Sequence, residues 1–262
     1  METHAGEGGM NAQISALICA HNEETRIADC LERLRFADEV VVVLDRCTDR
    51  TEEIARRFTD RLLKGAWDNE GDRRNAGIAF CRGPWVLEVD ADERVGEALA
   101  REIADAARGS SFDWHEIPVD NYIGQRLVRH GWGASFGRSA YAGLFKKGAK
   151  IWGRERVHPK LAFKGSKGPR LENPIQHYVD RDIADMIGRL NRYTSLRAMD
   201  LRASGDPGSF AHNVRRIFSR FWKCYVARKG YREGGYGFLI ALCAALYPIL
   251  SYLKATLEKD PP

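Results

Sequence analysis

The 262-residue chain lacks several features that would assign it to a common class. Its six cysteines are scattered without a Cys-x-x-Cys spacing, which argues against a zinc site and against a disulfide framework. Residues 1–11 are polar and glycine-rich, and they contain no apolar core of a signal peptide. We therefore expect a disordered leader over residues 1–12 and a reducing, cytoplasmic location.

No single sign of charge dominates, since 41 Lys and Arg face 36 Asp and Glu, a net charge of +5. Such a small excess does not by itself indicate a nucleic-acid partner, and we expect none. A glycine-rich phosphate loop is also missing after the first apolar run, where His21-Asn22-Glu23-Glu24 stands. This absence argues against a nucleotidyltransferase. The length of 262 residues with 44% hydrophobic content is enough for one large domain or for a domain with an appendage.

The first half of the chain alternates apolar runs with amphipathic segments. Residues 14–20, 39–44 and 85–89 are nearly continuous apolar runs, which is typical of parallel strands buried on both faces. Residues 23–36 carry apolar side chains at steps of three and four, as a helix does. This alternation predicts an α/β fold with a doubly wound, mostly parallel sheet.

Two aspartates follow the apolar run of residues 85–89, one residue apart. Asp90 and Asp92 would lie at the carboxyl end of the sheet, where open α/β sheets bind ligands. Two carboxylates suit Mg²⁺ or Mn²⁺, which complete their ligand shell with substrate phosphates. The alternatives are a strand end that is merely solvated and a helix N-cap formed by Asp92.

Four polar segments lie at the ends of successive elements in this half. They are Ala20-His21-Asn22-Glu23, Asp45-Arg46-Cys47-Thr48-Asp49, Asp72-Arg73-Arg74-Asn75-Ala76-Gly77 and Asp90-Ala91-Asp92. Their order and spacing over residues 14–95 resemble the nucleotide-sugar-binding half of family 2 glycosyltransferases, which have the Rossmann-like GT-A fold.

The resemblance implies a donor site that reads a nucleotide. Asp45 matches the aspartate that accepts a hydrogen bond from the base, a charge-assisted bond suited to uracil. Leu44 precedes it where the family usually has a second acid. Asn22 and Glu23 match the loop that contacts the nucleotide. Turn and cap chemistry is the alternative for Asp45 and Asp49.

The resemblance also implies a phosphate and metal site. Arg74 and Asn75 match an Arg-Asn pair that supports the diphosphate and the aspartate loop. Asp90 and Asp92 match the metal-binding pair, with Asp92 as the direct ligand of Mg²⁺ or Mn²⁺. The donor implied is a UDP-sugar, a UDP-hexose such as UDP-glucose.

The second half is similar to a bacterial branch that adds glucose or a related sugar to the inner core of lipopolysaccharide. The matching segments are Gly131-Trp132, Leu144-Phe145-Lys146-Lys147, Val157-His158-Pro159 and His177-Tyr178. Pro159 replaces a glutamate of that branch, so the catalytic base must come from elsewhere.

Three side chains of this half are candidates for catalysis or acceptor binding. Glu155 is the nearest carboxylate, although flanking arginines would keep it charged and a surface ion pair is the alternative. His158 is a candidate base or third metal ligand, or else a core histidine. Trp132 offers an aromatic face to a sugar unless it belongs to the core.

The C-terminal region combines basic and apolar residues. Residues 238–253 are nearly all apolar but are short for a membrane span and are interrupted by Pro248. Seven basic residues precede them without an acid among them: Arg215, Arg216, Arg220, Lys223, Arg228, Lys229 and Arg232. This composition predicts a helical element that lies on an anionic membrane. The alternative is a packed helix pair with a solvated basic face.

The chain is therefore expected to have a leader (1–12), a GT-A catalytic domain (13–180) and a helical membrane-associating region (181–262). The nucleotide-sugar half would span 13–95 and the acceptor half 96–180. The resemblance implies an inverting, metal-dependent transferase that acts on a lipid-linked glycan, the lipopolysaccharide core, at the inner face of the cytoplasmic membrane. One alternative is a haloacid-dehalogenase-like phosphatase. The segment Asp90–Val95 resembles the nucleophile loop of those enzymes, except at Arg94. The other is a non-catalytic membrane-surface scaffold.

Overall fold

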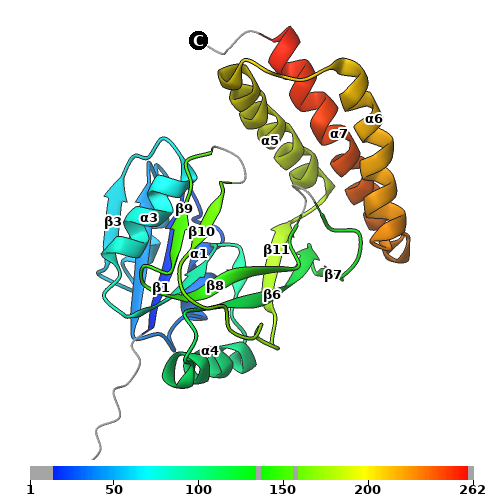
Figure 1. Cartoon of the computed structure of the whole chain (residues 1–262). Helices are drawn as coiled ribbons and strands as arrows, with labels where there is room; N and C mark the ends of the chain where they lie inside the picture. The colour runs from blue at the N-terminus through cyan, green and yellow to red at the C-terminus, as the bar shows by residue number, and fades with distance from the viewer. Residues whose placement is uncertain (1–13, 134–136, 156–158, 259–262) are drawn as a thin grey trace, which may run out of the picture.

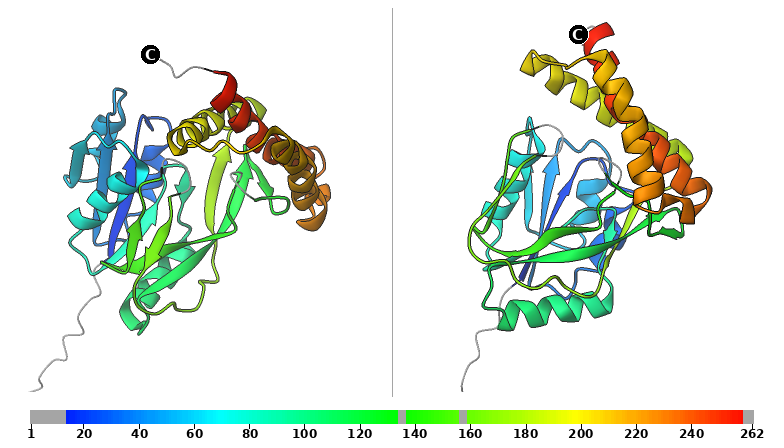
Figure 2. Two further views of the ribbon diagram at one scale, coloured as in Figure 1. Left: turned by 45° about the horizontal axis from the view of Figure 1, so that its top comes forward. Right: turned by 45° about the vertical axis from the view of Figure 1, so that its right-hand side comes forward.

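A computed structural model describes residues 14–133, 137–155 and 159–258 of the chain, so the predicted leader lies outside the described residues. Figure 1 shows an α/β domain around a central sheet, with a group of long helices beside it at the C-terminal end. The two further views in Figure 2 show the same helices standing together beside one edge of the sheet.

The first half of the sheet consists of four parallel strands in the order β3-β2-β1-β4. They are β1 (Ile14–Ala20), β2 (Glu39–Asp45), β3 (Leu62–Gly65) and β4 (Trp85–Val89). Ile18 of β1 pairs with Val42 on one side and with Val89 on the other. All residues of β1 are buried, because helices cover both faces of the sheet here.

The second half of the sheet is largely antiparallel. It continues from β4 through β8 (Ala140–Lys146), β6 (Trp114–Ile123) and β11 (Ile175–Asp180) to β5 (Glu93–Arg94), and β7 (Arg126–Val128) pairs with β6. In this half only β6 and β11 are parallel neighbours. A mostly parallel sheet was expected; the described residues between β6, β7 and β8 contain no helix, and short connections favour antiparallel pairing, so the sheet is mixed. A separate two-stranded sheet joins β9 (Lys150–Trp152) and β10 (Leu161–Phe163).

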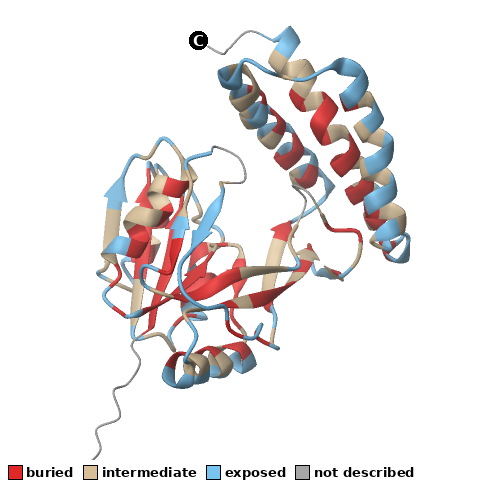
Figure 3. Ribbon diagram, in the orientation of Figure 1, coloured by how far each residue is buried: buried red, intermediate tan, exposed pale blue. Residues whose placement is uncertain are grey.

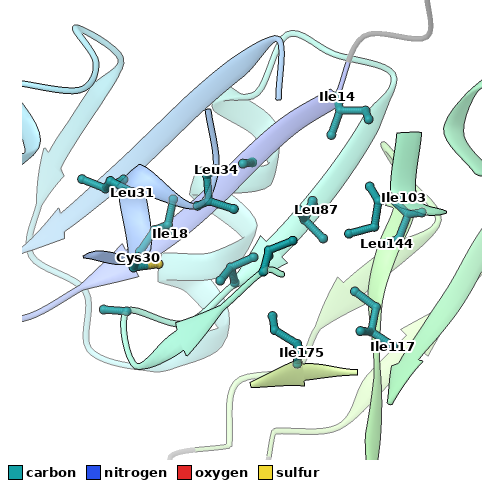
Figure 4. Packing of buried hydrophobic residues seen from close by; sticks show 14 of the residues in the cluster. Ile14, Ile18, Cys30, Leu31, Leu34, Leu87, Ile103, Ile117, Leu144 and Ile175 are labelled. Atoms are coloured by element: carbon teal, nitrogen blue, oxygen red, sulfur yellow. The ribbon is translucent and has the colours of Figure 1, made fainter. Parts of the chain in front are cut away.

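Helices on both faces of the sheet form two cores. The first core combines one face of the sheet with α1 (Ile27–Glu32), α2 (Thr51–Ala55) and α4 (Glu97–Gly109), and Figure 4 shows part of its packing. The other face packs against α3 (Glu70–Phe80) through Ile78. Alternate residues of β1 serve the two cores, since Ile18 points to the first and Leu17 to the other.

The C-terminal helices form a third core of their own with the sheet edge. They are α5 (Ile183–Ser204), α6 (Phe210–Trp222), the short turns η1 (Lys223–Ala227) and η2 (Gly230–Glu233), and α7 (Gly235–Leu257). Met186 and Leu190 of α5 pack there with Ile240 of α7 and with Val179 of β11. Arg189 of α5 also forms a buried bidentate ion pair with Asp180, with N···O distances of 2.9 and 2.7 Å.

The apolar segment expected to lie on a membrane is the central helix of this group. Helix α7 runs unbroken through Pro248. By length and composition alone it is apolar enough to cross a membrane, with a mean hydropathy of 1.8, but 56% of that stretch is buried inside the protein. The core helix of a soluble protein passes the same test. Residues 238–253 therefore bury much of their apolar surface against α5 and α6, and one apolar helix of this kind is consistent with a membrane-associating extension.

Candidate active site

The aspartate pair lies in the short loop between β4 and β5, at the carboxyl end of β4. Asp90 accepts hydrogen bonds from the guanidinium groups of Arg74 (2.7 Å) and Arg138 (3.2 Å). Burial opposes ionisation of Asp90, but these two arginines outweigh burial and hold the pKa of its carboxyl well below the ordinary value. Asp90 is therefore a fixed anion with both carboxylate oxygens engaged.

Asp92 is similarly accessible, with 24% of its side chain exposed against 27% for Asp90. One of its oxygens lies 3.5 Å from Nη1 of Arg26 and 3.5 Å from Nε2 of His177. The other ring nitrogen of His177 lies 2.9 Å from Oδ1 of Asn121. Burial disfavours the imidazolium, but the Asp92 carboxylate outweighs this and raises the pKa of His177.

His177 was not among the predicted site residues, although the His-Tyr segment that contains it was part of the resemblance. Strand β11 brings it to the site, because His177 pairs with Glu93 of β5, the residue that directly follows Asp92. The sequence therefore contained a signal, the motif His177-Tyr178, but it did not reveal that this motif pairs with the strand after Asp92.

The donor atoms around Asp92 partly fit a divalent cation. No group of three His, Cys, Asp or Glu side chains in the described parts of the chain is arranged to hold a metal ion. Asp92 and His177 nevertheless place a carboxylate oxygen and an imidazole nitrogen next to each other. Mg²⁺ uses one or two protein carboxylates together with substrate phosphates and water, so a protein set this small fits an ion that arrives with a diphosphate.

A largely buried ion network lies beside the aspartate loop and supports it. Glu88 of β4 accepts hydrogen bonds from Arg74, from Lys150 Nζ at 2.9 Å and from Trp152 Nε1 at 3.2 Å. The Arg74 guanidinium also lies over the Trp152 ring, 4.7 Å from its centroid. These contacts fix Arg74, and hence Asp90, relative to α3, β4 and β9. Lys150 and Glu88 were not predicted from the sequence.

Glu93 closes the loop from the other end. Its buried carboxylate accepts the backbone N–H of Asp90 at 2.9 Å, the Tyr141 hydroxyl at 3.2 Å and the Arg138 guanidinium at 2.6 Å. Arg138 thus binds Asp90 and Glu93 together, and it comes from the segment before β8. Neither Arg138 nor Glu93 was singled out in the sequence, because the antiparallel half of the sheet brings these two residues together.

The predicted base-reading residue lies at the carboxyl end of β2. Asp45 is 6% exposed. Its carboxylate accepts hydrogen bonds from Arg46 Nε at 3.0 Å and from the Trp67 backbone N–H at 3.3 Å, and Arg73 Nη1 lies 3.5 Å away. Its neighbour Asn22 has a left-handed backbone (φ 57°), and its side-chain oxygen accepts the Thr48 N–H at 2.8 Å. In the structure Asn22 therefore holds the loop that follows β2.

The other predicted donor residues play two different parts. Glu23 is half-buried, and burial followed by the nearby Asp92 charge raises the pKa of its carboxyl. Asn75 exchanges two hydrogen bonds with the backbone of Trp152, at 2.9 and 3.0 Å. Asn75 consequently ties α3 to β9, the strand that leads to Glu155.

The candidate acceptor residues are placed less closely around the loop. Glu155 is exposed, and its pKa is lowered chiefly by the Lys160 backbone N–H, which it accepts at 3.0 Å. Flanking arginines were the expected cause, but Arg154 pairs with Asp72 instead. His158 lies outside the described residues. Trp132 is 9% exposed and donates its indole N–H to the Val128 carbonyl within the C-terminal core, so its placement fits the core alternative and corrects its assignment as a sugar platform.

The fold and the polar residues at the carboxyl ends of β1, β2 and β4 define a class of protein. Residues 15–141 match the model of glycosyl transferase family 2, and the chain is a glycosyltransferase of this family. This membership sets aside the phosphatase and scaffold alternatives.

Several known proteins are similar over most of the chain. The lipopolysaccharide core biosynthesis glycosyltransferase LpsC of Rhizobium meliloti is 24% identical, covering 92% of this chain and 91% of the relative. An uncharacterized glycosyltransferase of Rickettsia bellii is 22% identical over 94% of this chain and 86% of its own.

Solved structures show weaker likeness. The S. aureus TarS 1-349 complex with UDP-GlcNAc has a TM-score of 0.49 and 14% identity, and covers 90% of this chain and 81% of TarS. Glucosyl-3-phosphoglycerate synthase of Mycobacterium tuberculosis, solved with Mn²⁺ and UDP-glucose, has a TM-score of 0.36 and 19% identity over 42% and 44% of the chains.

Proposed function

We propose that this glycosyltransferase is inverting and metal-dependent, and that it moves a hexose from a UDP-hexose such as UDP-glucose to a lipid-linked glycan, the lipopolysaccharide core. The carrying observation is that Asp45, Asp90 and Asp92 gather at one edge of the sheet, where open α/β sheets bind ligands. The acceptor class is supported by the similarity to LpsC, whose name states a role in lipopolysaccharide core biosynthesis. We place the enzyme peripherally on the inner face of the cytoplasmic membrane, where such an acceptor would be reached.

A screen of nucleotide sugars tests this proposal directly. The purified chain is incubated with truncated lipopolysaccharide core and with each donor in turn, and released nucleoside diphosphate is measured. Turnover with UDP-hexoses that needs the acceptor supports the proposal. Turnover confined to GDP- or dTDP-sugars would show that the assigned donor is wrong.

The base of the donor is expected to be read by Asp45. The Asp45 carboxylate would accept a hydrogen bond from the N–H of uracil. With the wrong base this buried carboxylate stays unpaired, which gives a difference in affinity between bases of about tenfold or more. Calorimetry should therefore show tighter binding of UDP than of GDP, and Asp45→Asn should lose this difference. Asp60→Asn, at an exposed position before β3, is the matched control and should bind UDP like the wild type. Equal affinities of the wild type for UDP and GDP would contradict the assignment.

The metal site in this proposal consists of Asp92 and His177. A bound Mg²⁺ or Mn²⁺ would supply neutralisation of the negative charge that grows on the departing diphosphate. The chain's own part is to fix the anions around it. Arg74 and Arg138 hold Asp90 in its charged form, and Glu93 holds the backbone of the loop. This preorganisation is what makes electrostatic stabilisation effective, since the dipoles need not reorganise during the reaction.

The acceptor hydroxyl needs a group that takes its proton, and we assign this role to Glu155, with His158 as the second candidate. Glu155 is exposed, and like an ordinary glutamate it carries a charge at neutral pH, although its lowered pKa makes it a weaker base. Glu155→Gln is expected to reduce transfer by about 10²-fold or more while UDP affinity stays unchanged. Glu172→Gln, another exposed carboxylate, should leave transfer unchanged. Full activity of Glu155→Gln would contradict this assignment and leave His158 as the candidate base.

A further inference from the structure

The outward face of α6 exposes large aromatic side chains. Phe218 and Trp222 are 72% and 65% exposed. Arg215 precedes Phe218 by three residues, and Trp222 follows it by four, so the three side chains share one face of the helix. Figure 3 shows this outer side of α6 as exposed, while the neighbouring α7 is largely buried. The third core is thus complete without these two aromatic rings.

The aromatic surface continues from α6 to the start of α7. Phe221, one turn from Phe218, contacts the ring of Phe238 at 5.6 Å between centroids. Tyr225 contacts the rings of both Phe238 (6.0 Å) and Tyr231 (6.4 Å). Tyr231 and Phe238 are themselves 50% and 48% exposed. Aromatic side chains therefore line a connected stretch at this end of the helical group.

The same stretch carries almost only positive charge. Residues 210–238 contain seven Arg and Lys and a single acid, Glu233. Glu233 is buried and accepts the backbone N–H groups of Arg129 and His130, each at 2.9 Å. None of the seven cations forms an ion pair with a carboxylate in the described residues. Arg215, Lys223, Lys229 and Arg232 are exposed, so their charge is available to a partner.

We propose that this face binds an anionic lipid bilayer, with the aromatic rings in the headgroup region and the cations against the lipid phosphates. The docking face consists of Arg215, Phe218, Trp222, Lys223, Tyr231 and Phe238. Exposed aromatic rings flanked by Lys and Arg are the composition of elements that lie in a membrane interface. A second copy of the chain fits poorly, because it would bring two positive faces together. The proposal places the enzyme on the surface that carries its proposed acceptor, but it rests on these exposed side chains and not on the identity of donor or acceptor.

Vesicle flotation of the full chain tests the docking face without any substrate. The wild type should float with phosphatidylcholine vesicles that contain phosphatidylglycerol, should float poorly with phosphatidylcholine alone, and should dissociate as salt rises. Phe218→Ser/Trp222→Ser should weaken binding by about tenfold or more, because it removes the apolar surface of two rings that lipid would bury. Arg215→Gln/Lys223→Gln should weaken binding to the anionic vesicles by about tenfold or more and reduce the preference for them.

Matched controls come from α4 and from the segment that follows it, on another part of the molecule. Phe112→Ser removes an exposed aromatic ring, and Arg101→Gln/Arg108→Gln removes two exposed cations, so both should bind like the wild type. Thermal unfolding of every variant checks that the fold is retained. Brominated lipid should quench tryptophan fluorescence in the wild type, and Trp222→Phe should remove most of that quenching.

Four outcomes would overturn the proposal. The wild type would stay off anionic vesicles at low salt, or Phe218→Ser/Trp222→Ser would bind them unchanged. A dimer in solution that this double variant dissociates would show that the face joins two copies, and tighter binding to single-stranded RNA than to vesicles would show a nucleic-acid surface. Vesicle binding by a chain that releases no nucleoside diphosphate would refute the proposed function alone, so the two failures are distinguishable.

Discussion

Replacing Asp92 with asparagine is expected to lower sugar transfer by about 10²- to 10³-fold, the loss typical of a group that stabilises transition-state charge. The amide keeps the size of the side chain but removes the negative charge that faces His177, 3.5 Å away. The metal dependence of turnover should weaken together with the rate. Both are measured by initial rates over a Mn²⁺ titration, after treatment with a chelator.

Asp105→Asn is the matched control for this substitution. Asp105 lies on α4 with 71% of its side chain exposed, far in sequence from the loop after β4, and its variant should titrate with Mn²⁺ like the wild type. His177→Gln should reproduce the Asp92→Asn phenotype in milder form, because it removes the second proposed ligand. A wild-type metal titration for Asp92→Asn would show that the cation, if required, is held elsewhere.

The second large effect is expected on stability, from Arg189→Met. This substitution leaves Asp180, only 2% exposed, without the guanidinium that holds both of its oxygens. Breaking a buried pair in this way is destabilising by about 3–5 kcal/mol, because an uncompensated charge stays inside the protein. Urea unfolding followed by circular dichroism measures the loss in the free energy of unfolding.

Two further variants show whether burial is the cause. Arg181→Met breaks the neighbouring pair with Asp185, but the Arg181 side chain is 70% exposed, so water screens the loss and the effect should be much smaller. Asp180→Asn/Arg189→Met removes both buried charges and should recover part of the stability lost by the single variant. Equal losses for Arg181→Met and Arg189→Met would refute the account based on burial.

The first half of the fold could be predicted because its strands are buried on both faces. The runs Ile14–Ala20 and Trp85–Val89 leave no alternating pattern, which favours parallel strands covered by helices. The antiparallel half was less predictable, since its pairing depends on where short strands meet rather than on local composition. Pro248 suggested an interruption of the last helix, but packing between α5 and α6 maintains α7 through it.

The site was predictable where its residues follow a strand directly. Asp45, Asp90 and Asp92 lie at strand ends, as the sequence predicts, although their roles remain predictions. Arg138, Glu93 and His177 were missed because they come from the segment before β8, from β5 and from β11, and only the folded sheet brings these together. For Trp132 the local sequence was not sufficient, since a tryptophan after a glycine has the same local pattern on a surface as in a core.

The third core has a practical consequence for anyone who wishes to isolate the catalytic part. A chain cut after Asp180 would uncover Ile123, Val128 and Val179, which α5 and α7 shield from water, and would also remove the cation that neutralises Asp180. Such a fragment would expose an apolar surface at the edge of the sheet and would be prone to aggregate. Even a cut before α6 would strip the buried side of α5. The proposed membrane attachment and catalysis must therefore be separated by exchanging surface side chains, because the helices that carry the proposed docking face also cover the apolar edge of the sheet.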